Sequence, residues 1–70
     1  MQVYTIILSW DAEAEVWCAM NDDIPIALES ESIDVLIERV KNATPELLEL
    51  NGKDSKCTLH FIAERKVDVA

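Results

Sequence analysis

The sequence predicts a small α+β domain with the element order β-β-β-α-β. Three observations support this fold class. The chain has 70 residues, half of them apolar, which suits one domain with a small core. Its first thirty residues contain short runs of β-branched, aromatic and alternating apolar side chains, the pattern typical of strands. After Ser32 the apolar residues recur every three or four positions, which indicates an amphipathic helix. No repeat or linker divides the chain, so we expect residues 1–70 to form a single domain.

Three strands are expected before the helix. Residues 2–10 carry apolar side chains on both faces, which predicts a strand covered on both sides. A short polar turn separates them from residues 16–20, so these two strands should form an antiparallel hairpin. The cluster at 21–23 is typical of a turn, and Pro25 holds the residue before it extended. Residues 26–29 are then expected to add a short third strand.

One helix follows, with Ser32 as its predicted N-cap. Its apolar face consists of Ile33, Leu36, Ile37, Val40, Ala43, Leu47 and Leu50. Pro45 lacks an N–H donor and costs about 3 kcal/mol inside a helix. Because Thr44 and Pro45 also fit the start of a new helix, a kink or a break is predicted there. Gly52 is expected to end the helix in the left-handed conformation.

A last strand is predicted at residues 57–65, where apolar and polar side chains alternate. A right-handed crossover returns this strand parallel to the first one, which gives the sheet order 3-2-1-4 with the helix on one face. The other face is then partly uncovered, and two strand edges have no neighbour. Exposed edges favour pairing with another chain, so a homodimer is expected.

Charge is distributed unevenly along the chain. Fourteen acidic and six basic residues give a net charge of −8. Residues 1–38 contain no Lys or Arg, whereas residues 39–70 contain all six bases. The acids of the first segment are Asp11, Glu13, Glu15, Asp22, Asp23, Glu29, Glu31, Asp34 and Glu38. The negative electrostatic field of these acids attracts a basic partner and argues against nucleic-acid binding. An acidic surface can also serve solubility alone.

Other broad classes are disfavoured by the composition. No apolar run approaches the roughly 20 residues of a membrane span, and the N-terminal residues do not resemble a signal peptide. Cys18 and Cys57 are too few for a disulfide framework or a zinc site, so two buried thiols in a reducing compartment are expected. These observations predict a cytoplasmic protein without a membrane partner.

Catalytic motifs are weak. His60 has no Lys, Ser or Cys placed near it as a catalytic partner, and Gly52 alone cannot form a phosphate-binding loop. The element order resembles half of a ribonuclease H-like fold, whose nucleases bind metals through acids on the first strand, the helix and the fourth strand. Here the corresponding positions offer only Asp11, Glu38 and Glu64, which are not placed to converge on two ions. We therefore predict no catalytic residue, metal or cofactor, and a nuclease acting through Asp11 and Glu38 is the least favoured hypothesis.

Two tryptophans flank the turn after the first strand. Exposed tryptophans are strong interface anchors, whereas buried ones belong to the core, which is their commoner position in a small sheet. We expect core positions for Trp10 and Trp17, with Trp17 the better candidate for an interface.

Residues 10–52 resemble the HicB-like antitoxins of bacteria and archaea, and more specifically a short single-domain branch related to them. The similar segments are WDAEAEVWCAM, DDIP, SIDVLIERV and PELLELNG. The resemblance implies a cytoplasmic antitoxin that binds and occludes a small basic HicA-like toxin, a ribonuclease that cuts messenger RNA. Two features differ from the family: Ile26 replaces the usual glycine after the loop proline, and no DNA-binding segment follows before Ala70. Operator binding is therefore not expected.

These arguments lead to one preferred function and one alternative. The preferred function is a non-enzymatic, acidic protein-binding module. The residues expected to contact the basic partner are Asp11, Glu13, Asp22, Asp23 and Trp17. The alternative is a homo-oligomeric structural or scaffold protein, assembled through a sheet edge or the uncovered face.

Overall fold

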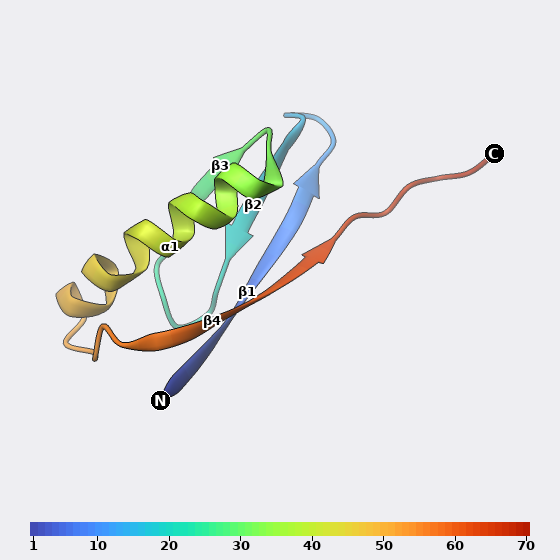
Figure 1. Cartoon of the computed structure of the whole chain (residues 1–70). Helices are drawn as coiled ribbons and strands as arrows, with labels where there is room; N and C mark the ends of the chain where they lie inside the picture. The colour runs from blue at the N-terminus through green and yellow to red at the C-terminus, as the bar shows by residue number, and fades with distance from the viewer.

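The computed structural model describes residues 1–70 and contains one four-stranded sheet and one helix (Figure 1). The elements are β1 (Gln2–Asp11), β2 (Val16–Met20), β3 (Leu28–Ser30), α1 (Ile33–Leu50) and β4 (Cys57–Glu64). The sheet order is β3-β2-β1-β4, with β4 parallel to β1 and the other two pairs antiparallel. This confirms the predicted element order and strand order. The molecule measures 47 × 18 × 18 Å, because residues 65–70 extend beyond the end of β4 (Figure 1).

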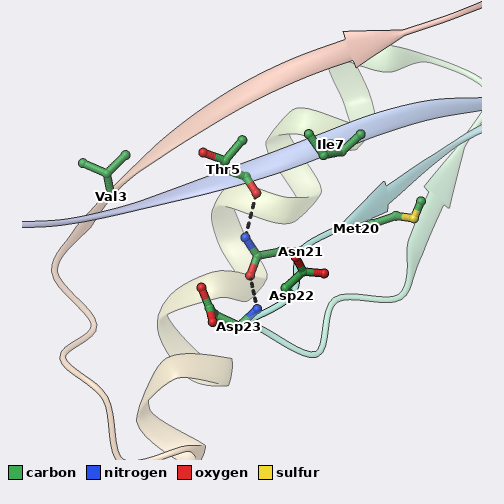
Figure 2. Close-up of a pocket in the computed structure, with 7 residues that line it drawn as sticks. All are labelled: Val3, Thr5, Ile7, Met20, Asn21, Asp22 and Asp23. Atoms are coloured by element: carbon green, nitrogen blue, oxygen red, sulfur yellow. Dashed lines mark hydrogen bonds between the residues drawn. The ribbon is translucent and has the colours of Figure 1, made fainter.

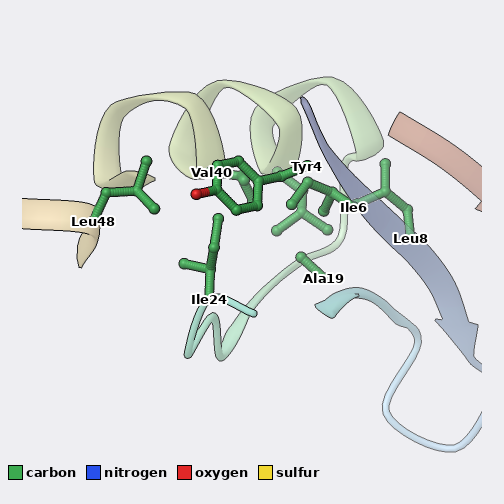
Figure 3. Close-up of a cluster of buried hydrophobic side chains, with 8 residues drawn as sticks. Tyr4, Ile6, Leu8, Ala19, Ile24, Val40 and Leu48 are labelled. Carbon is green, nitrogen blue, oxygen red and sulfur yellow. The ribbon is translucent and has the colours of Figure 1, made fainter. Parts of the chain in front are cut away.

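The core lies between α1 and one face of the sheet (Figure 3). The buried apolar residues are Tyr4, Ile6, Leu8, Ala19, Ile24, Leu36, Val40 and Leu48. Three of them are alternate residues of β1, an inner strand with β2 on one side and β4 on the other. Alternate residues share one face of a strand, so this set places α1 over the even-numbered side of β1.

The opposite face of the sheet has no helix or loop over it (Figure 1). Val3 is 56% exposed there, and Ile7 is only half-buried. The prediction that the first strand is covered on both sides is therefore wrong within the chain. The reason is that a single helix covers only one face of a four-stranded sheet, and this chain has no second helix for the other face.

Both ends of α1 are capped as the sequence predicts. At the start, the Ser32 hydroxyl accepts a hydrogen bond from the Val35 N–H at 3.3 Å. At the end, Gly52 has φ +69°. Its N–H donates to the Glu49 carbonyl at 3.1 Å, and the Lys53 N–H donates to the Leu48 carbonyl at 2.9 Å. This pair of bonds is the Schellman motif, which satisfies carbonyls that a helix end leaves free.

Of the kink or break predicted at Pro45, the break is absent, because α1 runs from Ile33 to Leu50 through the proline. Pro45 is exposed, whereas Val40, Thr44 and Leu48 are each at most 1% exposed on the side facing the sheet. The buried Thr44 hydroxyl is satisfied by donating to the Val40 carbonyl at 2.6 Å. Burial of residues on both sides of Pro45 thus offsets the lost backbone hydrogen bond.

The helix α1 is not apolar over a sufficient length to cross a membrane.

The third strand is shorter and later than predicted. It begins at Leu28 rather than at Ile26 and contains three residues. The Ile26 N–H donates to the Ile24 carbonyl at 2.7 Å, so the chain makes a tight turn around Pro25 before it can pair with β2. The remaining strands differ from the predicted ranges by at most one residue at an end.

Candidate functional site

The strongest candidate site is the sheet face opposite α1, which we call the open face. Cross-strand partners lie on the same face of a sheet, so the register defines its members. They are Val3, Thr5, Ile7, Ser9 and Asp11 of β1; Val16, Cys18 and Met20 of β2; Glu29 of β3; and Thr58, His60, Ile62 and Glu64 of β4.

The middle of the open face is apolar. Ile7 is paired with Met20 on β2 and with Ile62 on β4, so three apolar side chains cross three strands in a row. Met20 is 50% exposed and Ile62 is 44% exposed. Contiguous exposed apolar side chains on a small protein mark a surface that contacts another molecule.

One end of the open face is hollowed where the loop after β2 approaches β1. The hollow has a volume of about 420 Å³. Figure 2 shows its two sides, with side chains of β1 along one and the loop along the other. The lining residues are Val3, Thr5, Ile7, Met20, Asn21, Asp22 and Asp23. An apolar wall therefore meets two carboxylates in one depression.

Asn21 fixes this loop against the sheet (Figure 2). Its Nδ2 donates to the Thr5 carbonyl at 2.6 Å, and Asn21 directly follows Met20, the last residue of β2 that pairs with β1. Its Oδ1 accepts from the N–H groups of Asp23 and Ile24 at 2.7 and 2.8 Å. The side chain thus extends the strand ladder and shapes the turn at the same time. As a result, Asp22 and Asp23 are held at the edge of the hollow.

The carboxylates of Asp22 and Asp23 are free of any structural role within the chain. Neither side chain makes a hydrogen bond or a salt bridge, and both residues are exposed. Among all fourteen acids, only Glu38 forms a salt bridge, with Lys41 at 3.7 Å. The acidic surface is consequently almost unneutralised by the chain itself.

The five residues predicted to bind the partner do not form one cluster. Asp11 and Glu13 lie at the β1–β2 turn, whereas Asp22 and Asp23 follow the other end of β2. The Asp11 carboxylate is also engaged, because it accepts hydrogen bonds from the N–H groups of Glu13 and Ala14 at 3.1 and 3.2 Å. Asp22 and Asp23 are therefore the better placed pair for a partner.

Trp17 lies on the helix side of the sheet, not on the open face. Its ring meets that of Trp10 edge to face, with 5.5 Å between centroids. The Arg65 guanidinium carbon is 4.2 Å from the Trp10 centroid and 6.0 Å from that of Trp17. Both tryptophans are half-buried, and Trp17 packs against the core. The expectation of core positions is thus met only in part, and the pair is separated from the hollow.

The two cysteines lie on opposite faces of the sheet. Cys18 is paired with Ser9 on the open face, and Cys57 is paired with Gln2 on the helix side. Each thiol is free and only partly buried, which corrects the prediction of two buried thiols. Desolvation, followed by the carboxylates of Glu29 and Asp11, raises the pKa of Cys18 above its ordinary value of 9.0. The Cys18 thiol therefore stays protonated near neutral pH.

No three His, Cys, Asp or Glu side chains gather where they could hold a metal ion. Asp11 lies at the end of β1 and Glu38 lies on the exposed side of α1, where it pairs with Lys41. His60 is exposed on the open face beside Thr5.

Sequence reasoning missed two elements of the site. The first is the bond from Asn21 to Thr5, since the sequence predicts a turn at residues 21–23 but a contact between residues distant in sequence has no local signal. The second is the apolar middle of the open face. Its signal lies in the odd-numbered apolar residues of β1, because the same pattern also fits a strand buried on both faces.

Comparison with known proteins identifies the family but assigns no activity. Comparison with curated proteins gives no significant match. A hypothetical protein of the extremely thermophilic bacterium Thermus thermophilus, TTHA1013, has a crystal structure similar to this chain, with 30% sequence identity and a TM-score of 0.75. The match covers 99% of each chain. The profile of DUF1902, a domain of unknown function, matches residues 3–69. The chain therefore belongs to the DUF1902 family.

Proposed function

We propose that this protein is a non-enzymatic binding module that occludes a small basic protein with its open face. The resemblance of residues 10–52 to HicB-like antitoxins suggests the class of partner, a basic ribonuclease of the HicA toxin type. The observation that supports the proposal most directly is the hollow beside β1, in which apolar side chains adjoin the unpaired carboxylates of Asp22 and Asp23.

The open face has the layout of a protein interface. Its apolar middle, formed by Ile7, Met20 and Ile62, can bury surface against the apolar centre of a partner. Acids surround this middle: Asp22 and Asp23 at one end, and Asp11, Glu29 and Glu64 at the other. A partner with basic residues around an apolar patch complements both features. The charges then increase the association rate, and apolar burial slows dissociation.

The test begins with capture of the tagged protein from its source lysate at low and then high salt, with mass spectrometry of the eluted proteins. We expect a small basic protein that elutes as salt rises. Its association rate is then measured with Asp22→Lys and Asp23→Lys combined. The matched control combines Glu46→Lys and Glu49→Lys, which makes the same change in net charge on the exposed side of α1.

We expect the loop variant to associate on the order of tenfold more slowly and with a weaker dependence on salt, whereas the helix variant changes little. Equal slowing in both variants would mean that only net charge matters. If neither variant associates more slowly, the acids do not attract the partner. Bound partner should also protect Cys18 from alkylation, because this thiol lies on the open face.

The proposal includes no catalytic step. We therefore expect the protein not to hydrolyse RNA when magnesium or manganese is added. Metal-dependent RNA cleavage that is abolished by Asp11→Asn would contradict the proposal and support a nuclease instead.

A further inference from the structure

The two edge strands of the sheet differ in how well they are protected. β3 has only three residues, follows Pro25 closely and carries Glu29, with Glu31 just beyond it. Short length, proline and charge are the usual ways in which proteins block an edge. β4 has eight residues, contains no proline and is hydrogen-bonded only to β1. Its outer edge is therefore open to pairing along its whole length.

A groove follows β4 on the helix side of the sheet. The helix backbone lies nearest to β2 and β3, and β4 is at the far edge of the sheet, so the β4 side chains on that face remain only half-buried. The groove has a volume of about 310 Å³. Its apolar lining comes from Ile37, Pro45, Cys57, Leu59 and Phe61.

The segment after β4 carries apolar side chains that the chain itself does not cover. Val67 is 69% exposed and Val69 is 91% exposed. Val67 and Val69 are separated from Leu59 and Phe61 by an even number of residues. In an extended conformation they therefore lie on the same face of the strand, the one that faces the helix. Arg65 begins the segment, with its guanidinium carbon 4.2 Å from the Trp10 ring centroid. Figure 1 shows that the chain then runs away from the body of the domain.

This segment cannot fill the groove of its own chain. Val67 follows the last residue of β4 by only three positions, and a tight reversal there would place it beside Glu64, far from Leu59 and Cys57. The intervening Arg65 and Lys66 are also not the Gly, Asn or Asp residues that two-residue hairpin turns favour. The occupant that fits is the same segment of a second copy.

We propose that two copies pair antiparallel through their β4 edges, and that residues 65–70 of each copy extend along β4 of the other. Val67 and Val69 of each copy then enter the groove beside β4 of the other copy. The pairing joins the two sheets into one of eight strands and removes the open edge of β4 in both. It uses a surface different from the open face, so it is independent of the proposed function.

Electrostatics favour this region for self-association and exclude two neighbouring registers. Residues 53–70 contain four bases and three acids, whereas residues 1–38 contain only acids, so this is a part of the chain where two copies meet without strong repulsion. A two-fold axis at Ala63 places Val67 opposite Leu59 and Val69 opposite Cys57. Moving the axis to Glu64 or Arg65 would place like charges directly opposite each other, which is unfavourable.

The test is the oligomeric state of the full chain, measured by analytical ultracentrifugation over a range of concentrations and salt. We expect a dimer that is favoured by added salt, because salt screens the repulsion between two chains of charge −8. Val67→Lys combined with Val69→Lys should weaken it about tenfold or more, because two apolar side chains lose their burial. Val35→Lys combined with Leu50→Lys, at two exposed apolar residues of the helix, is the matched control because it makes the same change in net charge.

Crosslinking tests the contact directly. In a chain with Cys18→Ser and Cys57→Ser, Ala63→Cys should form an intermolecular disulfide on mild oxidation, and Val3→Cys on the open face should not. A monomer at all concentrations, a dimer indifferent to the two lysines, or crosslinking through Val3→Cys would each overturn the proposal. Because the Asp22→Lys and Asp23→Lys variant should still dimerise, failure of this proposal is distinguishable from failure of the proposed function.

Discussion

The two faces of the sheet have similar side chains and opposite environments. Ile6 and Ile7 are neighbours in β1, yet Ile6 is 0% exposed beneath α1 and Ile7 lies half-buried on the open face. The difference comes from the single helix, which covers one face and leaves the other to solvent. Apolar residues that a small domain leaves uncovered are available for binding, and here they are surrounded by acids without salt-bridge partners.

The largest test of this comparison is truncation of the two isoleucines. Ile6→Ala should lower the free energy of unfolding by about 3 kcal/mol, because it leaves a cavity in the core. Ile7→Ala should cost about 1 kcal/mol or less, because its side chain is already partly in water. Urea denaturation followed by circular dichroism measures both.

A domain of this size has little stability to lose, so Ile6→Ala alone can prevent folding. Ile6→Val, which should cost about 1 kcal/mol, keeps the comparison measurable in that case. Equal costs at the two positions would show that the open face is covered in solution, as by a second copy, and would end the distinction between the faces.

A smaller effect is expected where the open face depends on Asn21. Asn21→Ala removes the bond to the Thr5 carbonyl and leaves the Asp23 and Ile24 N–H groups without their acceptor. We expect a loss of about 1–2 kcal/mol in the free energy of unfolding, together with slower association of a basic partner. Asn42→Ala, at an exposed helix residue, is the control and should not reduce stability. A stable variant with unchanged association would mean that Asn21 does not position the acids.

The smallest expected effect is the contribution of Cys18 to the pH dependence of the free energy of unfolding. Its pKa is raised in the folded state, so the folded protein holds this proton more tightly than the unfolded chain, whose thiol titrates near 9.0. Stability from this group is complete below that pH and declines as the pH rises above it. The loss of stability between about pH 8 and about pH 10 should therefore be smaller in Cys18→Ala than in the wild type. An identical loss in both would show that the open face does not disfavour the thiolate.

Local sequence patterns were sufficient for most of the fold. Ser32 and Gly52 mark the ends of α1 through hydrogen bonds within a few residues, so their roles follow from residue type and spacing. The strand order follows from the hairpin and from the handedness of the crossover. The absence of a break at Pro45 has no local signal, because the burial of Thr44 and Leu48, which keeps the helix continuous, depends on a sheet formed by distant segments.

The candidate site was only partly predictable for the same reason. The sequence by itself determined the amount of negative charge and its concentration in residues 1–38, since charge depends only on composition. Tertiary structure decided which acids are free, separating Asp22 and Asp23 from the turn that engages Asp11. It also decided which apolar residues remain exposed, because one helix covers only one face of the sheet and burial depends on what packs against each face.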